Sequence, residues 1–154
     1  MRIGYAIYET TLGKILIEYD NENIVGLFRV KEDPKDFGIK NQLTELVYKE
    51  ITEYLEGKRK EFTFPFKLSG TPFQKSVWKA LCDIPYGETR SYKEIAIAIG
   101  NPKACRAVGL ANNKNPISIA VPCHRVIGSD GKMVGYGGGL DMKITLLELE
   151  KKNK

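Results

Sequence analysis

The first 30 residues alternate apolar and polar positions in three short runs. The runs cover residues 3–8, 14–19 and 24–30, and two turn-forming stretches separate them, Thr11-Leu12-Gly13 and Asp20-Asn21-Glu22-Asn23. Alternation of this kind places every second side chain on one face of a strand, and short turns join antiparallel neighbours. The pattern predicts a three-stranded antiparallel meander that serves as a scaffold.

A helical period replaces the alternation after residue 42. Apolar residues recur three or four positions apart, and the run stops at Gly57; its members are Leu43, Leu46, Val47, Ile51, Tyr54 and Leu55. This spacing predicts a helix. Residues 61–70 are expected to form a strand and then a linker. The sequence therefore predicts an α+β fold, with a scaffold domain at residues 1–68 and a second domain at residues 69–154.

The second half is predicted to be mostly helical. Thr71-Pro72 is typical of an N-cap followed by proline at the first helical position. The apolar stripe that follows consists of Phe73, Val77, Trp78, Leu81 and Cys82, so Cys82 is expected in the core. Ser91-Tyr92-Lys93-Glu94 has the pattern of a capping box, which begins a short helix that ends at Gly100.

A further helix is expected from residue 102 to residue 112. Two helices joined by a tight turn make a helix-turn-helix pattern, which is typical of DNA-binding proteins. The second helix carries one long cation, Arg106, among small residues: Ala104, Ala107, Gly109 and Ala111. Small residues allow close approach to a nucleic acid and also tight packing against another helix. The pattern favours the two interpretations equally.

The net charge of +5 is unevenly distributed. Residues 1–68 hold 11 Lys and Arg against 12 Asp and Glu, whereas residues 69–154 hold 13 against 7. A basic half indicates a polyanionic partner, and nucleic acid is favoured over a membrane because no basic helix has a broad apolar face. With no apolar run near the roughly 18 residues that cross a bilayer and no signal-peptide pattern, we expect a cytoplasmic protein.

The most informative segment follows an apolar run, residues 117–121, which is expected to be a short buried strand. Next come Pro122, Cys123, the only histidine, His124, and Arg125. A thiol becomes a nucleophile when a nearby base or cation favours the thiolate. A carboxylate behind the imidazole would fix its tautomer, and Glu150, Asp130 and Asp141 are the candidates.

Other motifs restrict the chemistry. The three cysteines, an odd number without a Cys-x-x-Cys pair, predict reduced thiols and no metal site. Residues 135–139 are rich in glycine but lack the spacing of a dinucleotide or phosphate-binding loop, so no nucleotide cofactor is expected. A terminal helix over residues 140–151 is expected to turn Leu140, Ile144 and Leu147 inward.

The Cys-His-Arg segment belongs to a longer pattern. The string Pro122-Cys123-His124-Arg125-Val126-Ile127-Gly128 is preceded by Asn115-Pro116 and followed by Tyr136 and Gly138-Gly139-Leu140. These residues resemble the active-site motif of the O6-alkylguanine-DNA alkyltransferases, the DNA repair proteins also called methylated-DNA-protein-cysteine methyltransferases. The similarity extends back through Arg106-Ala107-Val108-Gly109 and Tyr92 to Thr71-Pro72-Phe73-Gln74. It covers about residues 70–151, and the first half matches in size and element order, which implies a ribonuclease H-like arrangement.

The resemblance implies a DNA repair enzyme that acts once, without a cofactor. Cys123 would take the alkyl group of O6-alkylguanine, or of O4-alkylthymine, and keep it as a thioether. His124 would accept the thiol proton through a water, and Glu150 would orient His124. Tyr92 would donate to a guanine ring nitrogen, and Asn115 would hold the turn that leads into the site.

The resemblance also implies that a monomer binds duplex DNA and flips the target base out of the stack. Arg106 would take the place of the flipped base, and the helix around it would enter the minor groove, whereas the helix-turn-helix pattern alone predicts the major groove. Tyr92, Ala104, Ala107 and Arg125 would also contact DNA. The wall of the base pocket would be formed by Val126, Tyr136, Gly137 and Gly138.

Two features depart from patterns seen in the family. Some members bind a structural zinc through Cys and His in the first half, but residues 1–81 contain neither. Some carry proline where this chain has Ser118, which predicts a looser or less apolar pocket wall and leaves the range of alkyl groups open. Cys105, beside Arg106, is expected to be a packing residue.

Two other classes of protein share parts of this pattern. A non-catalytic alkyltransferase-like protein flags damaged DNA without repairing it, but such proteins replace the acceptor cysteine, so Cys123 argues against this class. A helix-turn-helix regulator could use Cys123 as a sensor of oxidation or alkylation. That regulator would need a dimer, and nothing in the sequence resembles a dimerisation helix.

Overall fold

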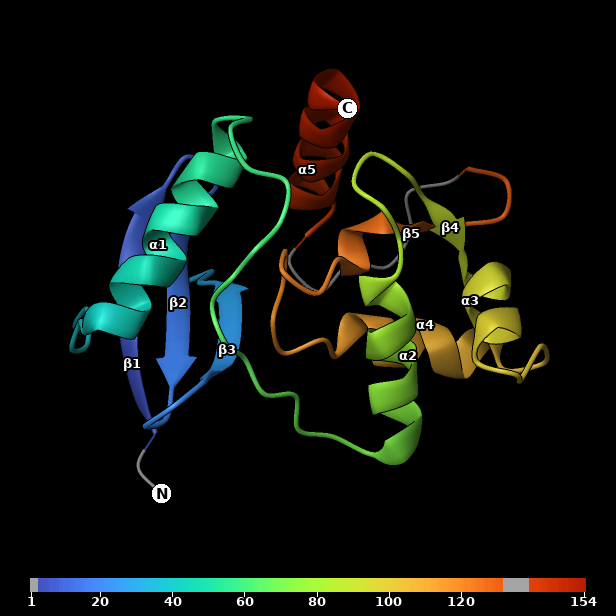
Figure 1. Ribbon diagram of the computed structural model, residues 1–154, viewed down its shortest axis with the longest axis horizontal. Helices are drawn as coiled ribbons and strands as arrows, with labels where there is room; N and C mark the ends of the chain where they lie inside the picture. The colour runs from blue at the N-terminus through green and yellow to red at the C-terminus, as the bar shows by residue number, and fades with distance from the viewer. Residues whose placement is uncertain (1–2, 132–138) are drawn as a thin grey trace. The chain divides into compact units, whose positions relative to one another are not determined.

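The computed structural model describes residues 3–131 and 139–154 (Figure 1). The chain divides into two compact units, Met1–Leu68 and Ser69–Lys154, and each is described by itself. Tyr136, Gly137 and Gly138, which the sequence assigns to the pocket wall, lie outside the described residues.

The first unit is an antiparallel sheet with one helix along a face (Figure 1). β1 (Gly4–Thr10) pairs with β2 (Gly13–Tyr19), which pairs with β3 (Ile24–Arg29). The helix, α1 (Gln42–Leu55), begins at Asn41, whose side chain accepts from the Thr44 backbone amide at 2.8 Å. The predicted meander and helix are confirmed.

Residues 61–70 do not form the strand that the sequence predicts. Phe66 pairs with Ile24 through an isolated parallel bridge. The ring centroids of Phe62 and Phe64 lie 5.7 Å apart, and those of Phe64 and Phe66 lie 6.2 Å apart. Contacts between these aromatic rings account for the alternating apolar positions, while Pro65 has no backbone N–H to donate to a ladder.

The second unit begins with two helices that start where the sequence predicts. α2 (Pro72–Cys82) is capped by Thr71, whose hydroxyl accepts from the Gln74 amide at 3.1 Å. α3 (Tyr92–Ala98) is capped by Ser91, whose hydroxyl accepts from the Glu94 amide at 3.0 Å. In both boxes the third residue of the helix also accepts from the backbone of the cap, so both helix starts are specified locally.

α3 and α4 (Cys105–Asn113) form the predicted helix-turn-helix pair. Helix α4 starts later than expected because residues 101–104 form a turn, closed by a 3.0 Å hydrogen bond from the Ala104 amide to the Asn101 carbonyl. The indole Nε1 of Trp78 donates to the Ala111 carbonyl at 2.8 Å, which joins α2 to α4. This contact orients the second helix of the pair.

The remaining elements surround Cys123. A 3-10 turn, η1 (Cys123–Arg125), leads into β5 (Val126–Ile127), which pairs in parallel with β4 (Arg90–Ser91). The last helix is α5 (Leu140–Asn153). Its buried face is not the predicted one, since Leu140 and Ile144 are exposed while Met142, Lys143, Leu146 and Glu150 are buried.

Within residues 3–131 and 139–154, no helix has the length and apolar character that crossing a bilayer requires. The two units together have the α+β fold class that the sequence predicts, with a three-stranded sheet in the first unit and mostly helices in the second.

Two glycines with similar positive φ angles, Gly38 and Gly100, separate the cost of backbone strain from the cost of a steric clash. Gly38 has φ +71, and a Cβ there would lie 2.1 Å from the Tyr5 carbonyl oxygen, whereas Gly100 has φ +79 with nothing within 4 Å. We expect Gly100→Ala to lower the free energy of unfolding by about 1 kcal/mol. Gly38→Ala should lower it by roughly 2 to 4 kcal/mol because it adds a steric clash. Chemical denaturation followed by circular dichroism measures both, and equal losses would contradict the packing around Gly38.

Candidate active site

The segment before Cys123 is a buried turn, and the strand predicted for residues 117–121 is absent from it. The Asn115 side chain closes the turn, because its Oδ1 accepts from the Ile117 amide at 3.0 Å and its Nδ2 donates to the Val121 carbonyl at 2.7 Å. The apolar residues are buried as expected, but apolar content alone does not distinguish a buried strand from a buried turn. Asn115 thus determines the path of the chain into Cys123.

Ile119 in this turn has an unusual backbone. Its φ is +72, a left-handed conformation that a β-branched residue rarely adopts and that costs on the order of 1–3 kcal/mol. The side chain is 2% exposed, so burial holds the residue in place. The chain therefore accepts backbone strain four residues before the thiol, which is common where a functional group must be held rigidly.

Cys123 begins η1 and is buried, with 4% of its surface exposed. Its carbonyl accepts from Nδ2 of Asn112 at 3.3 Å, and its amide donates to the Val121 carbonyl at 2.8 Å. Burial disfavours a thiolate, so a buried thiol reacts as a nucleophile only where a group nearby accepts its proton.

A fully buried carboxylate joins the two residues that follow Cys123. Nε2 of His124 lies 2.7 Å from Oε2 of Glu150. The Arg125 guanidinium forms a fork on the same carboxylate, with Nε at 2.8 Å from Oε1 and a terminal nitrogen at 2.9 Å from Oε2. The Gly87 amide also donates to Oε1 at 3.3 Å. Of the three carboxylates that the sequence left open, Glu150 is the one in contact with His124.

These contacts indicate the protonation states. The bidentate Arg125 contact favours an ionised Glu150, which can only accept hydrogen bonds, so the proton of a neutral His124 is assigned to Nε2. Burial lowers the pKa of His124; Glu150 raises it, and Arg125 and Lys143 lower it. His124 is therefore neutral at pH 7. Its Nδ1 is buried and has no hydrogen-bond partner among the described residues, so it is the ring nitrogen able to accept a proton.

Lys143 is a site residue that the sequence analysis did not identify. Its side chain is fully buried, and Nζ donates to the Val126 carbonyl. Burial lowers the pKa of Lys143, while the thiolate form of Cys123 raises it. Lys143 precedes Glu150 by seven residues, so both lie on the same face of α5. A lysine and a glutamate seven residues apart, on the helix face that also carries Leu146, are the signal that could have revealed it.

Tyr92 lies at the start of α3, partly buried. Burial raises the pKa of its phenol, and the charge of Cys123 raises it further, so Tyr92 keeps its proton and can donate it. A Cβ on Gly109 of α4 would lie 3.8 Å from the Tyr92 ring. The backbone of α4 at position 109 therefore lies beside the ring of Tyr92.

Arg125 differs from its expected position. The resemblance puts it at the DNA, but the side chain is 7% exposed, and its guanidinium binds Glu150 and the Ile84 carbonyl, the latter at 2.7 Å. A guanidinium buried against these partners is not positioned to bind a DNA phosphate. Arg125 is instead a structural partner of Glu150.

The residues expected at the DNA on α4 are accessible. Arg106 and Ala107 are exposed, and Ala104 is partly buried just before the helix. Val126, expected in the pocket wall, is fully buried.

The other two cysteines lie outside this arrangement. Cys82 is exposed, so the prediction that it packs in the core was wrong; it is the last residue of α2, so no further turn of that helix covers it. Cys105 is partly buried at the start of α4. Cys123 is the buried thiol of the three.

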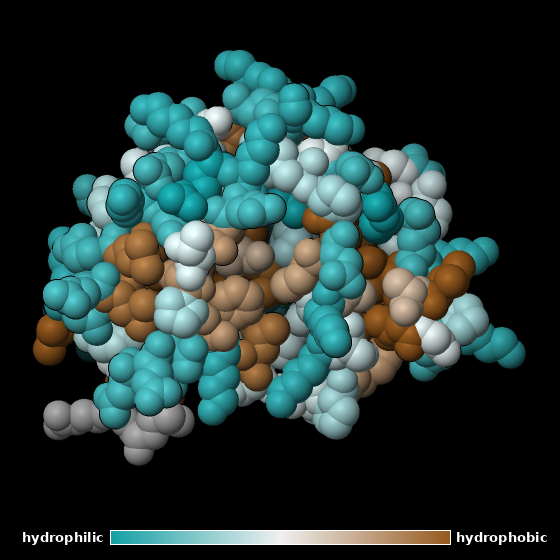
Figure 2. Space-filling model, viewed as in Figure 1, coloured by the Kyte–Doolittle hydropathy of each residue, from teal (hydrophilic) through white to brown (hydrophobic). Residues whose placement is uncertain are grey.

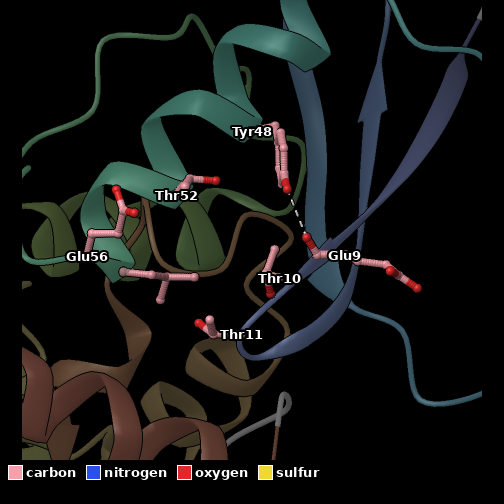
Figure 3. Close-up of a pocket in the computed structure, with 7 residues that line it drawn as sticks. Glu9, Thr10, Thr11, Tyr48, Thr52 and Glu56 are labelled. Carbon is pink, nitrogen blue, oxygen red and sulfur yellow. Dashed lines mark hydrogen bonds between the residues drawn. The ribbon is translucent and has the colours of Figure 1, made fainter.

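An open pocket in the first unit lacks comparable chemistry (Figure 3). It is lined by α1 and by the turn between β1 and β2, and Tyr48 donates to the Glu9 carbonyl at 3.1 Å across it. Its charged side chains, Glu9 and Glu56, are both acidic, which disfavours a polyanion.

Comparison with known proteins places both units in one family. Residues 3–68 match the ribonuclease-like domain of 6-O-methylguanine DNA methyltransferase, and residues 72–152 match its DNA binding domain. The methylated-DNA–protein-cysteine methyltransferase of Methanosarcina barkeri is 50% identical, over 97% of this chain and 98% of its own length. The inducible enzyme of Bacillus subtilis is also 50% identical, over 89% of this chain and 72% of its own length.

Solved structures of proteins in this family have the same fold as this chain. The O6-methylguanine methyltransferase of Mycobacterium tuberculosis is 42% identical with a TM-score of 0.90, covering 99% of this chain and 95% of its own. A complex of Mycobacterium tuberculosis OGT with DNA is 44% identical with a TM-score of 0.89, covering 97% of this chain and 93% of its own. The buried thiol and its imidazole thus occur in a DNA alkyltransferase fold. This chain belongs to the methylated-DNA–protein-cysteine methyltransferase family.

The buried His124 should make stability depend on pH. Its folded pKa lies below the ordinary 6.5, so the unfolded chain takes up the proton first as the pH falls. The free energy of unfolding should therefore decrease below about pH 6.5, by at most about 1.4 kcal/mol per pH unit.

Because His124 is the only histidine, His124→Gln should flatten the profile between about pH 5.5 and 7. Urea denaturation at a series of pH values measures this. An unchanged slope in the variant would contradict a depressed pKa for His124.

Proposed function

We propose that this protein repairs alkylated DNA by transferring the alkyl group of O6-alkylguanine, or of O4-alkylthymine, to Cys123 in a single irreversible step. The observation that carries the proposal is the buried thiol of Cys123, adjacent in sequence to a neutral His124 whose Nε2 lies 2.7 Å from the Glu150 carboxylate. The activity that names the relatives, methyl transfer from DNA to a protein cysteine, requires such a thiol.

The acid–base step follows from the protonation states. The Cys123 proton passes through a water to Nδ1 of His124, and Glu150 stabilises the imidazolium that forms. The thiolate then attacks the alkyl carbon, the carbon–O6 bond breaks, and its electron pair stays with the base. Lys143, whose buried ammonium donates to the carbonyl of Val126 three residues after Cys123, contributes a buried cation near the thiolate. A positioned base of this kind typically contributes a factor of about 10²–10⁴ in rate.

Tyr92 assists the leaving group. Guanine departs with a negative charge unless a proton reaches a ring nitrogen, and a phenol that keeps its proton at neutral pH can supply it. The raised pKa of Tyr92, caused first by burial, supports this role. The product thioether on Cys123 has no route back to the thiol within this site, so each molecule reacts once.

Reaction at a buried thiol requires that the target nucleotide leave the duplex. Flipping costs a few kcal/mol of stacking and pairing, and a side chain that fills the space can offset part of this cost. Arg106 is the candidate, since it is exposed on α4 with Ala107 beside it. The partner is then duplex DNA, contacted in the minor groove by a cytoplasmic monomer.

The proposed transfer reaction predicts a change in the mass of the protein. Incubation with duplex DNA that contains O6-methylguanine should add one methyl group per molecule, detected by mass spectrometry of the intact protein. Cys123→Ala should remove the gain completely because it lacks the acceptor sulfur. No gain in the native protein, or a gain that persists in the variant, would contradict the proposal.

A further prediction separates base flipping from the alkyl-transfer step. Arg106→Ala should slow reaction with modified duplex DNA about 10- to 100-fold more than reaction with the free modified base, because the free base needs no flipping. Lys79→Ala, which removes an exposed cation from α2, is the control for loss of charge. Equal losses of Arg106→Ala on both substrates would exclude a role in flipping.

A further inference from the structure

The outward face of α4 presents an apolar side chain at its centre. Val108, Ala111 and Asn112 are buried, whereas Arg106, Ala107, Leu110 and Asn113 are exposed. With 3.6 residues per turn, Leu110 lies one turn after Arg106 and Ala107 and one turn before Asn113. Leu110 is 65% exposed, and the long side chains one turn before and after it are those of Arg106 and Lys114, both exposed cations.

The inner face of the same helix contacts the reactive site. Nδ2 of Asn112 donates to the Cys123 carbonyl at 3.3 Å, and Gly109 lies against the Tyr92 ring. A single exposed leucine on a protein surface is ordinary. Here the leucine lies on the helix that supports the active-site turn, on the opposite side from these contacts.

The charges around Leu110 indicate what covers it. Between Glu94 and Asp130 the sequence contains no acidic residue. Of the four cations in this stretch, Arg125 is buried against Glu150, while Lys103, Arg106 and Lys114 are exposed at α4 and its ends. A surface with cations around an apolar centre complements duplex DNA, where phosphates flank a groove whose floor is made of base edges.

The exposed isoleucine of α3 provides a contrast. Ile97 is 54% exposed. Figure 2, drawn in the same view as Figure 1, shows hydrophobic surface on the side of the molecule where α3 lies. Ile97 lines a hollow whose charged residues are Asp83, Glu94 and Arg90, and the Arg90 guanidinium lies 3.1 Å from the Glu88 carboxylate. In this hollow the carboxylates outnumber the one cation, which is itself paired, so the surface around Ile97 matches DNA less well than the surface around Leu110.

We propose that Leu110 is a second DNA-contacting residue of α4, an apolar wedge that enters the same groove as Arg106 and packs against the bases beside the flipped nucleotide. The inference rests on the proposed function in requiring duplex DNA as the partner. Apolar side chains inserted at a base step partly unstack it and open the duplex. Leu110 would thus share with Arg106 the work of holding the duplex open.

Binding measurements test this without the transfer reaction. All variants are made in the Cys123→Ala background, and binding to a duplex that contains O6-methylguanine is measured by fluorescence anisotropy at several salt concentrations. Leu110→Ala should weaken binding about 10-fold at every salt concentration. The slope of log affinity against log salt should stay unchanged because no charge is lost, whereas Arg106→Ala should reduce it by about 1. Ile97→Ala, the matched control, should bind as the parent does.

A fluorescent base gives a second measurement. With 2-aminopurine next to the modified guanine, unstacking raises the emission on binding, and at saturating protein Leu110→Ala should give a smaller rise than the parent. Parent-like affinity and emission in Leu110→Ala would overturn the proposal. So would a parent protein that self-associates in sedimentation and becomes monomeric in this variant, because Leu110 would then bind a second copy of the chain.

The two proposals fail separately. Normal duplex binding with no methyl gain in the Cys123 protein would refute the transfer reaction and leave the Leu110 contact standing. A methyl gain with no effect of Leu110→Ala on binding would refute the Leu110 contact and leave the transfer reaction standing.

Discussion

The second unit depends on one buried carboxylate. Glu150 is 1% exposed and binds the His124 imidazole, two nitrogens of the Arg125 guanidinium and the Gly87 amide. Through these bonds α5 holds the active-site turn, and Arg125 extends the connection to the end of α2 by donating to the Ile84 carbonyl. Removing one partner of a buried ion pair leaves an uncompensated charge, which typically costs 3–5 kcal/mol. The residues that make the imidazole a proton acceptor are therefore also the residues that fix the turn containing the thiol.

The same cluster accounts for the neutral form of His124. Arg125 balances the charge of Glu150, and together with burial it lowers the pKa of His124. An imidazolium is thus costly in the resting protein. Lys143 adds a second buried cation on the α5 face that carries Glu150. Hydrogen bonds hold the charged groups of Glu150, Arg125 and Lys143 in fixed positions. A site fixed in this way suits a reaction that each molecule performs once.

Local rules predicted much of the fold. The sequence of Thr71 to Gln74 and of Ser91 to Glu94 sufficed to place two helix starts, since capping involves only neighbours in the chain. The errors share a different cause. Residues 117–121 are apolar because they are buried, but the Asn115 side chain bends them into a turn. The exposed positions of Leu140 and Ile144 in α5 follow from the buried Lys143 and Glu150, whose partners lie 17 or more residues away in sequence.

The sequence by itself determined the class of protein and indicated the candidate reactive residues, because the order Pro122-Cys123-His124-Arg125 and the helix around Arg106 are contiguous patterns. It also indicated a basic surface, since charge is a property of composition. Only the tertiary structure decided which carboxylate binds His124, that Arg125 is buried against that carboxylate, that Lys143 is buried near Cys123, and that Leu110 is exposed at the centre of α4. These facts concern residues far apart in the chain or the direction in which a side chain points. Burial and electrostatics depend on neighbours in space, which only the folded chain brings together.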